Sequence, residues 1–150
     1  MTTLKAGDKA PNFSGLDQSG NQHTLADYKG KKLVIFFYPK ASTPGCTAEV
    51  CDLRDNFKRF EAENYVLLGV SADNASRQTK FMEKYDLPFP LLADEDKSVI
   101  NAFEVWSPKK FMGKEYDGIH RTTFIIDEKG IIEEVIEKVK TKEHAAQILK

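Results

Sequence analysis

Residues 32–60, KLVIFFYPKASTPGCTAEVCDLRDNFKRF, contain the stretch that decides the fold. Residues 33–38 are β-branched, aromatic or otherwise apolar at every position, which is typical of a strand buried on both faces of a parallel sheet. Pro39 ends this run. After a short loop, Thr43-Pro44 predicts a helix start, with threonine as the N-cap residue and proline at the first helical position.

Cys46 occupies the third position of this predicted helix. The partial positive charge of a helix N-terminus favours the thiolate, which is the reactive form of cysteine. A buried cysteine that acts as a small apolar side chain is the plain alternative, but a first helical turn after a buried strand favours the reactive thiol. The helix also carries an apolar stripe that we expect to pack on the sheet, formed by Val50, Leu53, Phe57 and Phe60.

Cys51 lies in the same predicted helix, five residues after Cys46. A zinc site is disfavoured, because the chain has two cysteines and its three histidines are scattered singly. A structural disulfide is disfavoured too, since an intact helix would hold the two Cα atoms about 8.6 Å apart, beyond the reach of a bridge. A bridge requires the helix to unwind in part, which indicates a transient, catalytic disulfide.

These residues resemble a known family. Pro39, Thr43 and Cys46 match the peroxiredoxin pattern P-x-x-x-[TS]-x-x-C. The longer stretches FYPKASTPGCTAEVCDLRD and VWSPKKFMGKEYDGIHRTTFIID are similar to the peroxiredoxin Q branch, also called bacterioferritin comigratory protein. The resemblance covers nearly the whole chain. One departure is Ala41-Ser42, where the branch often has Asp-Asn, and it concerns a loop.

Composition sets the broad class of the protein. The 150 residues are 41% hydrophobic and 30% charged, which is typical of one globular domain, here residues 1–150. The net charge of −1 argues against nucleic acid or an anionic membrane as a partner. No run has the length of a signal peptide core or a membrane span. With two cysteines, these features favour a cytoplasmic protein whose disulfide is catalytic or regulatory.

The rest of the chain alternates strand and helix patterns. Residues 11–30 predict a β-hairpin with its tip near Gly20, followed by a short helical turn, and we expect His23 at the surface. Residues 104–119 mix aromatic residues and lysines and are interpreted as an ordered loop, in preference to a nucleic-acid site. The remaining predictions are strands at 65–71, 90–93, 122–127 and 131–139, and helices at 75–85, 98–103 and 143–149.

This succession predicts an α/β, thioredoxin-like fold: a central mixed sheet flanked by helices, with an N-terminal β-hairpin extension. A thioredoxin-type reductase is the main competitor. Such reductases carry C-x-x-C and a proline before the strand of the last hairpin, whereas this chain has C-x4-C and His120-Arg121-Thr122. Taken alone, Arg121 could be an ordinary strand-end cation. The resemblance implies that it lies against the reactive thiolate.

The resemblance implies a thiol peroxidase for hydrogen peroxide and organic hydroperoxides, with no metal or other cofactor. Cys46 would be the nucleophile that becomes a sulfenic acid, and Cys51 would resolve it as an intramolecular disulfide. Thr43 would cap the helix and hydrogen-bond thiolate and substrate, and Pro39 would shield the sulfur. Arg121 would stabilise negative charge. Glu49, one helical turn after the nucleophile, would orient that arginine.

Two other functions share these residues. A redox sensor would pass its disulfide to a partner protein without fast turnover, and a purely structural module would have thiols inert to peroxide. For the peroxidase, the resemblance implies thioredoxin or a similar dithiol protein as reductant, and a monomer.

Overall fold

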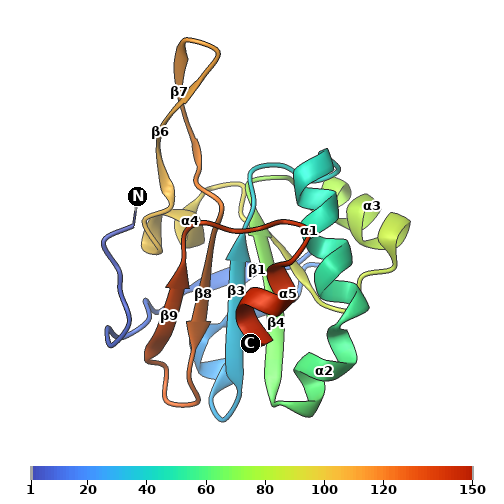
Figure 1. The fold of residues 1–150 in the computed structure, drawn as a ribbon, viewed down its shortest axis with the longest axis vertical. Helices are drawn as coiled ribbons and strands as arrows, with labels where there is room; N and C mark the ends of the chain where they lie inside the picture. Colours follow the sequence, from blue (N-terminus) through green and yellow to red (C-terminus); the bar gives the residue numbers. More distant parts are fainter. Residues whose placement is uncertain (1, 150) are drawn as a thin grey trace.

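The computed structural model describes residues 2–149, and its centre is a five-stranded mixed sheet with strand order β5-β4-β3-β8-β9 (Figure 1). Strands β3, β4 and β5 are parallel, whereas β8 is antiparallel to β3, and β9 is antiparallel to β8. The mixed sheet was predicted, and β9 lies at an edge as expected. The strands are β3 (Lys32–Phe37), β4 (Tyr65–Ser71), β5 (Leu91–Ala93), β8 (Thr122–Ile126) and β9 (Ile132–Ile136).

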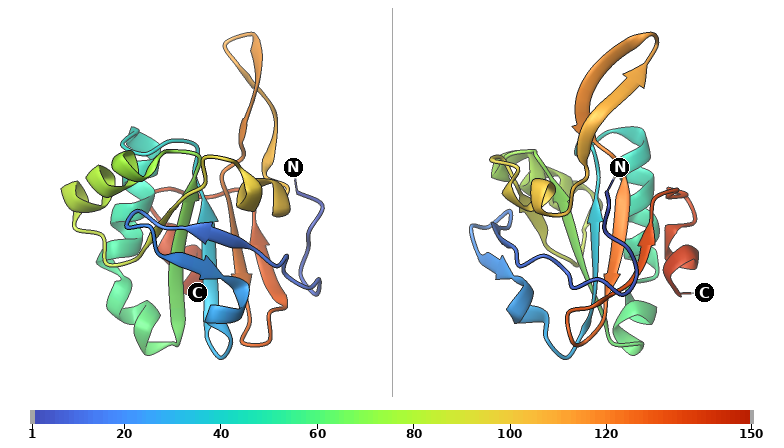
Figure 2. Two further views of the ribbon diagram at one scale, coloured as in Figure 1. Left: turned by 180° about the vertical axis from the view of Figure 1, so that it is seen from behind. Right: turned by 90° about the vertical axis from the view of Figure 1, so that its left-hand side faces the viewer.

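The side chains of the central strand β3 alternate between two apolar cores. Val34 and Phe36 belong to the core beneath α1 (Pro44–Asp55), α2 (Phe57–Ala62) and α5 (His144–Leu149). Leu33, Ile35 and Phe37 belong to the core on the other face, which α4 (Ser98–Ala102) and the N-terminal segment cover. Figure 2 shows these two layers on either side of the sheet. The unbroken apolar run is thus explained by burial on both faces.

The helix that follows β3 is shorter than predicted. A single helix as far as Phe60 is wrong, because α1 ends at Asp55 and α2 begins at Phe57. The side chain of Asn56 donates from Nδ2 to the carbonyl oxygen of Asp52, while its backbone N–H turns to the carbonyl of Leu53. The asparagine amide thereby replaces a backbone donor and bends the chain. The predicted stripe nevertheless packs on the sheet across the bend.

The N-terminal extension is the predicted hairpin, formed by β1 (Ser14–Leu16) and β2 (Gln22–Thr24), with the short helix η1 (Leu25–Tyr28) after it. Gly20 in the turn has a φ of 82°, which favours glycine. The surface position expected for His23 is wrong. Its ring nitrogens lie 2.6 Å from the hydroxyl of Tyr28 and 2.7 Å from the carboxylate of Asp17, so the side chain is partly buried.

Residues 104–119 are not the loop that the sequence suggested. They form a second antiparallel hairpin, β6 (Trp106–Phe111) and β7 (Lys114–Ile119), which projects from the body of the molecule (Figure 1). Trp106 packs at its base against the second core, but Tyr116 is about half exposed and Met112 at the tip is 88% exposed. The expected packing of the aromatic rings on the domain edge therefore holds for Trp106 but not for Tyr116, and the side chain of Phe111 lies outside the described part of the structure.

Candidate active site

Cys46 lies at the N-terminal end of α1, just beyond the end of the central strand. Pro44 and Gly45 are the first two helical residues, so Cys46 is the third, as predicted. Its side chain is fully buried, and its thiol is free. The positive end of the helix favours the thiolate, whereas burial alone disfavours it, so the reactive form depends on the charged groups around the sulfur.

Arg121 reaches the sulfur from the adjacent strand. Because β8 is antiparallel to β3, its first residue, Thr122, pairs with Phe37 at the end of β3. The arginine just before β8 therefore stands beside the start of α1. Its Nη2 donates to Sγ of Cys46 at 3.4 Å. The structure thus brings together a cation and a nucleophile that are 75 residues apart in sequence.

Glu49 holds the same guanidinium group from the other side. Its Oε1 accepts a hydrogen bond from Nη1 of Arg121 at 2.7 Å, and its side chain is fully buried. The two charge-assisted contacts of Arg121, to Glu49 and Cys46, fix the plane of its guanidinium group. Burial raises the pKa of the Glu49 carboxyl to about 7, although the charge of Arg121 and its hydrogen bond act in the opposite direction.

Thr43 is the N-cap residue by position, but the side-chain cap that was predicted is wrong. Its Oγ1 donates to the carbonyl oxygen of Lys40 at 2.7 Å, and no side-chain hydrogen bond caps the helix. This bond stabilises the turn before the helix. The hydroxyl oxygen keeps its acceptor capacity. Pro39, directly after β3, is partly buried, and its shielding of the sulfur stays a prediction.

Cys51 is partly exposed and free, and it lies in the intact helix α1 together with Cys46. This arrangement is a reduced, closed state. Because the helix is regular from Pro44 to Asp55, the two thiols cannot join without unwinding it.

A buried polar network that the sequence analysis missed supports the loop before the helix. The carboxylate of Asp73 accepts from the backbone N–H of Ala41 at 2.8 Å and from the hydroxyl of Ser71 at 2.6 Å. Gln78 donates to Ser71 and accepts from the hydroxyl of Tyr38. Charged and amide residues after a buried strand were a usable signal, but nothing in the sequence showed which loop they would bind.

A second missed residue is His144, the first residue of α5. It is fully buried, and its Nε2 lies 2.7 Å from the hydroxyl of Thr123 and 3.7 Å from Oε2 of Glu49. A signal for its burial existed, since His144 and Ile148 are four residues apart and share one face of a helix. Its approach to Glu49 could not be read from the sequence.

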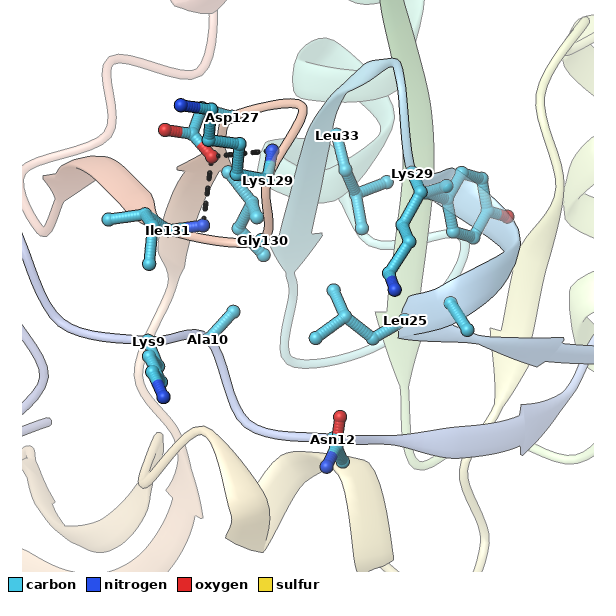
Figure 3. Close-up of a pocket in the computed structure, with 13 residues that line it drawn as sticks. Lys9, Ala10, Asn12, Leu25, Lys29, Leu33, Asp127, Lys129, Gly130 and Ile131 are labelled. Carbon is cyan, nitrogen blue, oxygen red and sulfur yellow. Dashed lines mark hydrogen bonds between the residues drawn. The ribbon is translucent and has the colours of Figure 1, made fainter.

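The larger cavities lie away from this site, and a smaller one of about 260 Å³ is lined by Arg121 and Thr122. A pocket of about 370 Å³ lies at the opposite end of β3 from Cys46, near Leu33, Leu25 and Gly130, with Lys9, Lys29 and Lys129 around it (Figure 3). It contains none of the predicted site residues. Among residues 2–149, no group of three or more His, Cys, Asp or Glu side chains is placed to hold a metal ion. In that part of the chain, no helix is both long and apolar enough to cross a membrane.

Known proteins are similar to this chain over nearly its whole length. The model of the AhpC/TSA family matches residues 6–135. Peroxiredoxin Bcp of Escherichia coli strain K12 is 48% identical over 149 residues, which cover 99% of this chain and 96% of that protein.

Two solved structures from Xanthomonas campestris are similar. Peroxiredoxin Q has a TM-score of 0.86 and 37% identity, over 91% of this chain and 87% of its own. The bacterioferritin comigratory protein, described in trapped intermediate/ligand complexes for its alkyl peroxide reduction activity, has a TM-score of 0.88 and 36% identity, over 93% of this chain and 88% of its own. They confirm the predicted thioredoxin-like fold. The chain therefore belongs to the AhpC/TSA family, within its branch of Bcp and PrxQ peroxiredoxins.

Proposed function

We propose that this protein is a thiol peroxidase that reduces hydrogen peroxide and organic hydroperoxides through Cys46 and Cys51, with thioredoxin or a similar dithiol protein as the reductant. One observation carries the proposal: a buried thiol at a helix N-terminus, with an arginine Nη2 3.4 Å from its sulfur. The membership in the peroxiredoxin branch supports the same chemistry.

The reaction follows from these groups. The Cys46 thiolate attacks the terminal peroxide oxygen, the O–O bond breaks, and the leaving alkoxide or hydroxide takes up a proton. Arg121 stabilises the negative charge as it moves from sulfur to the leaving oxygen, and Glu49 keeps its guanidinium group in position. The hydroxyl of Thr43 and the ring of Pro39 complete the substrate side of the site in this proposal.

Turnover requires Cys51. Its thiol attacks the sulfenic sulfur of Cys46, water leaves, and an intramolecular disulfide forms. A dithiol reductant then restores both thiols by exchange. Cys51 supports this role because it is partly exposed and lies in the helix whose first turns must open. In this proposal the protein acts as a monomer.

The test compares wild type with Cys46→Ser and Cys51→Ser. With a thioredoxin system, wild type consumes peroxide continuously, and Cys46→Ser loses all turnover, because the serine hydroxyl is not ionised at neutral pH. Mass spectrometry after one equivalent of peroxide shows a disulfide in wild type and a sulfenic or sulfinic acid at Cys46 in Cys51→Ser. A disulfide without sustained turnover would favour the redox sensor. Two unreactive thiols would leave a structural module.

A further inference from the structure

One oxygen of Glu49 has no hydrogen-bond partner. Oε1 binds Arg121, but Oε2 is fully buried and is the one side-chain polar atom of this kind among residues 2–149. An unsatisfied buried carboxylate oxygen is costly and calls for a physical explanation. The imidazole of His144, also fully buried, has its Nε2 3.7 Å from this oxygen.

The hydrogen bonds around His144 fix its tautomer. The side-chain oxygen of Gln147 accepts from the backbone N–H of Lys140, and its amide nitrogen donates to the carbonyl of Lys138. That oxygen lies 2.8 Å from Nδ1 of His144, so Nδ1 carries the hydrogen. In the neutral ring Nε2 is then an acceptor, and the hydroxyl of Thr123 donates to it at 2.7 Å.

Oε2 of Glu49 and Nε2 of His144 therefore face each other with no proton between them. A single added proton can bind to either of these two atoms. On Oε2 it points to the ring, and on Nε2 it points between the hydroxyl of Thr123 and the carboxylate.

A charge count shows why such a proton matters. With Cys46 as thiolate, this buried cluster holds two negative charges, on Cys46 and Glu49, against one positive charge on Arg121. Two further charged groups act on the cluster, one of each sign: Lys109 from β6 acts on Cys46 and Arg121, and Asp52 from α1 acts on His144. One proton on the pair makes the cluster neutral, and neutrality is strongly favoured in a buried site.

We propose that Glu49 and His144 together hold the proton that leaves the Cys46 thiol, which makes His144 a positioning residue of the peroxidase reaction. This inference rests on the proposed function. The proton moves from sulfur to the pair. After the thiolate has become a neutral sulfenic acid, the pair returns a proton to solvent, while the leaving alkoxide takes one up, so that charge and atoms balance.

The pKa directions agree with a shared proton. Burial raises the pKa of the Glu49 carboxyl to about 7 and lowers the pKa of the His144 imidazole. Burial therefore favours the neutral form of both side chains, which is the protonated carboxyl of Glu49 and the unprotonated imidazole of His144. Near neutral pH, neither side chain is strongly stabilised in its charged form.

The test measures how the rate of Cys46 oxidation by peroxide depends on pH, in Cys51→Ser so that the reaction stops at the sulfenic acid. Glutamine at position 144 can hydrogen-bond Thr123 but cannot take up a proton. In His144→Gln the proton returns to sulfur, so the rate profile and the ultraviolet absorbance of the thiolate move to higher pH. On the acid side of the profile, a displacement of one pH unit lowers the oxidation rate about tenfold.

Two further variants separate this role from a structural one. Thr123→Val removes the donor to Nε2, so the ring accepts a proton more readily and the profile moves to lower pH. In Glu49→Gln the cluster is neutral without the pair, and adding His144→Gln should then cause no further displacement. His23→Gln is the matched control, since His23 is also hydrogen-bonded and partly buried but belongs to the N-terminal hairpin.

Superimposable profiles for His144→Gln and its parent would overturn the proposal. So would an equal loss of rate at every pH, or a displacement that persists in Glu49→Gln. The proposed function fails separately, because Cys46 of the Cys51→Ser parent would then show no oxidation by mass before any profile is compared.

Discussion

Gly45 leaves room for the guanidinium group beside the reactive sulfur. A Cβ atom at this position would lie 3.2 Å from Nη2 of Arg121, closer than ordinary van der Waals contact. Since Arg121 is also held by Glu49, it cannot move away without weakening one of its two contacts.

Gly45→Ala should therefore change stability and reactivity in opposite directions. Alanine is a better helix former by up to about 1 kcal/mol, so the free energy of unfolding should not fall. Displacing Arg121 from Cys46 should slow peroxide oxidation about tenfold, corresponding to roughly 1.4 kcal/mol. Urea unfolding and stopped-flow oxidation measure the two quantities. In Arg121→Met, which is slow already, adding Gly45→Ala should leave the rate unchanged; a further loss would contradict this explanation.

The carboxyl of Glu49 predicts a pH dependence of stability. Its pKa is raised from 4.5 to about 7 by burial, so the folded state binds this proton more tightly than the unfolded state does. The contribution of Glu49 to the free energy of unfolding must then fall as pH rises from about 4.5 to about 7. His144 acts in the opposite sense, because its lowered pKa reduces stability as pH falls.

The Glu49 contribution is isolated by comparing wild type with Glu49→Gln, in which the site does not titrate. Urea unfolding of the two reduced proteins should be measured across this interval. The free energy of unfolding of wild type minus that of Glu49→Gln should decrease as pH rises. A difference that increases with pH would mean that attraction to Arg121 outweighs burial.

At this scale, the sequence predicted that Cys46, Arg121 and Glu49 lie together, as they do in the structure, because each belongs to a motif or to a helical spacing. It did not identify His144 or Asp73. Their roles depend on which elements pack against α1 and its preceding loop, and neither residue lies within a recognisable motif. The side-chain cap of Thr43 failed for a local reason: its hydroxyl is held by the bond to the carbonyl of Lys40, and in that orientation it accepts no N–H of the helix.

Helix α5 is tied to the helix that must open. The carboxylate of Asp52 in α1 accepts the backbone N–H of Ala145 at 2.7 Å, which satisfies a free donor in the first turn of α5. Unwinding of α1 as far as Cys51 would disturb this contact. The closing helix therefore stabilises the reduced, closed state.

Asp52→Ala should make α1 open more easily. Losing an N-terminal helix cap costs about 1 kcal/mol, so disulfide formation after oxidation of Cys46 should accelerate about fivefold. The sulfinic acid that competes with the disulfide should decrease at high peroxide. Quenched-flow mass spectrometry measures both products. Asp55→Ala is the control, because Asp55 lies in the same helix but its side chain pairs with Arg54 at the surface; equal acceleration there would exclude a role for α5.

The errors at the scale of elements have definite causes. The sequence does not predict the β6–β7 hairpin, because its turn, Met112-Gly113, does not resemble the usual Asn-Gly signal. Both residues nevertheless have positive φ values, 51° and 80°, as that turn requires. Pro108 lies within β6, and a two-stranded ribbon consists of edges, where proline is tolerated.

At the scale of the molecule, the sheet order brings distant segments of the chain together. The sequence predicted the buried strands and their order along the chain, since periodicity and helix signals are local. The central position of β3 between β4 and β8 aligns the start of α1 with the start of β8 and thus completes the site. The position of a strand in a sheet depends on tertiary packing. Only the family resemblance therefore indicated that Arg121 lies beside Cys46.

The oxidised molecule should be less stable than the reduced one. A disulfide that closes so short a loop stabilises a protein by about 2 kcal/mol through the unfolded state. Forming it must open the first turns of α1, whose side chains at Cys46, Glu49 and Val50 are all fully buried. Burial of one large aliphatic side chain contributes about 1.5–3 kcal/mol, and the contacts of Arg121 are lost as well. The cost of opening should therefore exceed the gain from the cross-link.

This difference also affects function, because a disulfide that weakens the fold is more readily reduced. Unfolding in urea should show a lower midpoint for the oxidised protein, with faster amide exchange around Cys46 and Cys51 and unchanged protection in β3 and β4. Cys51→Ser after peroxide treatment is the control, since it is oxidised at Cys46 but forms no bridge and should keep the protection of α1. An oxidised protein as stable as the reduced one, with its disulfide confirmed by mass, would show that the bridge forms without loss of the helix.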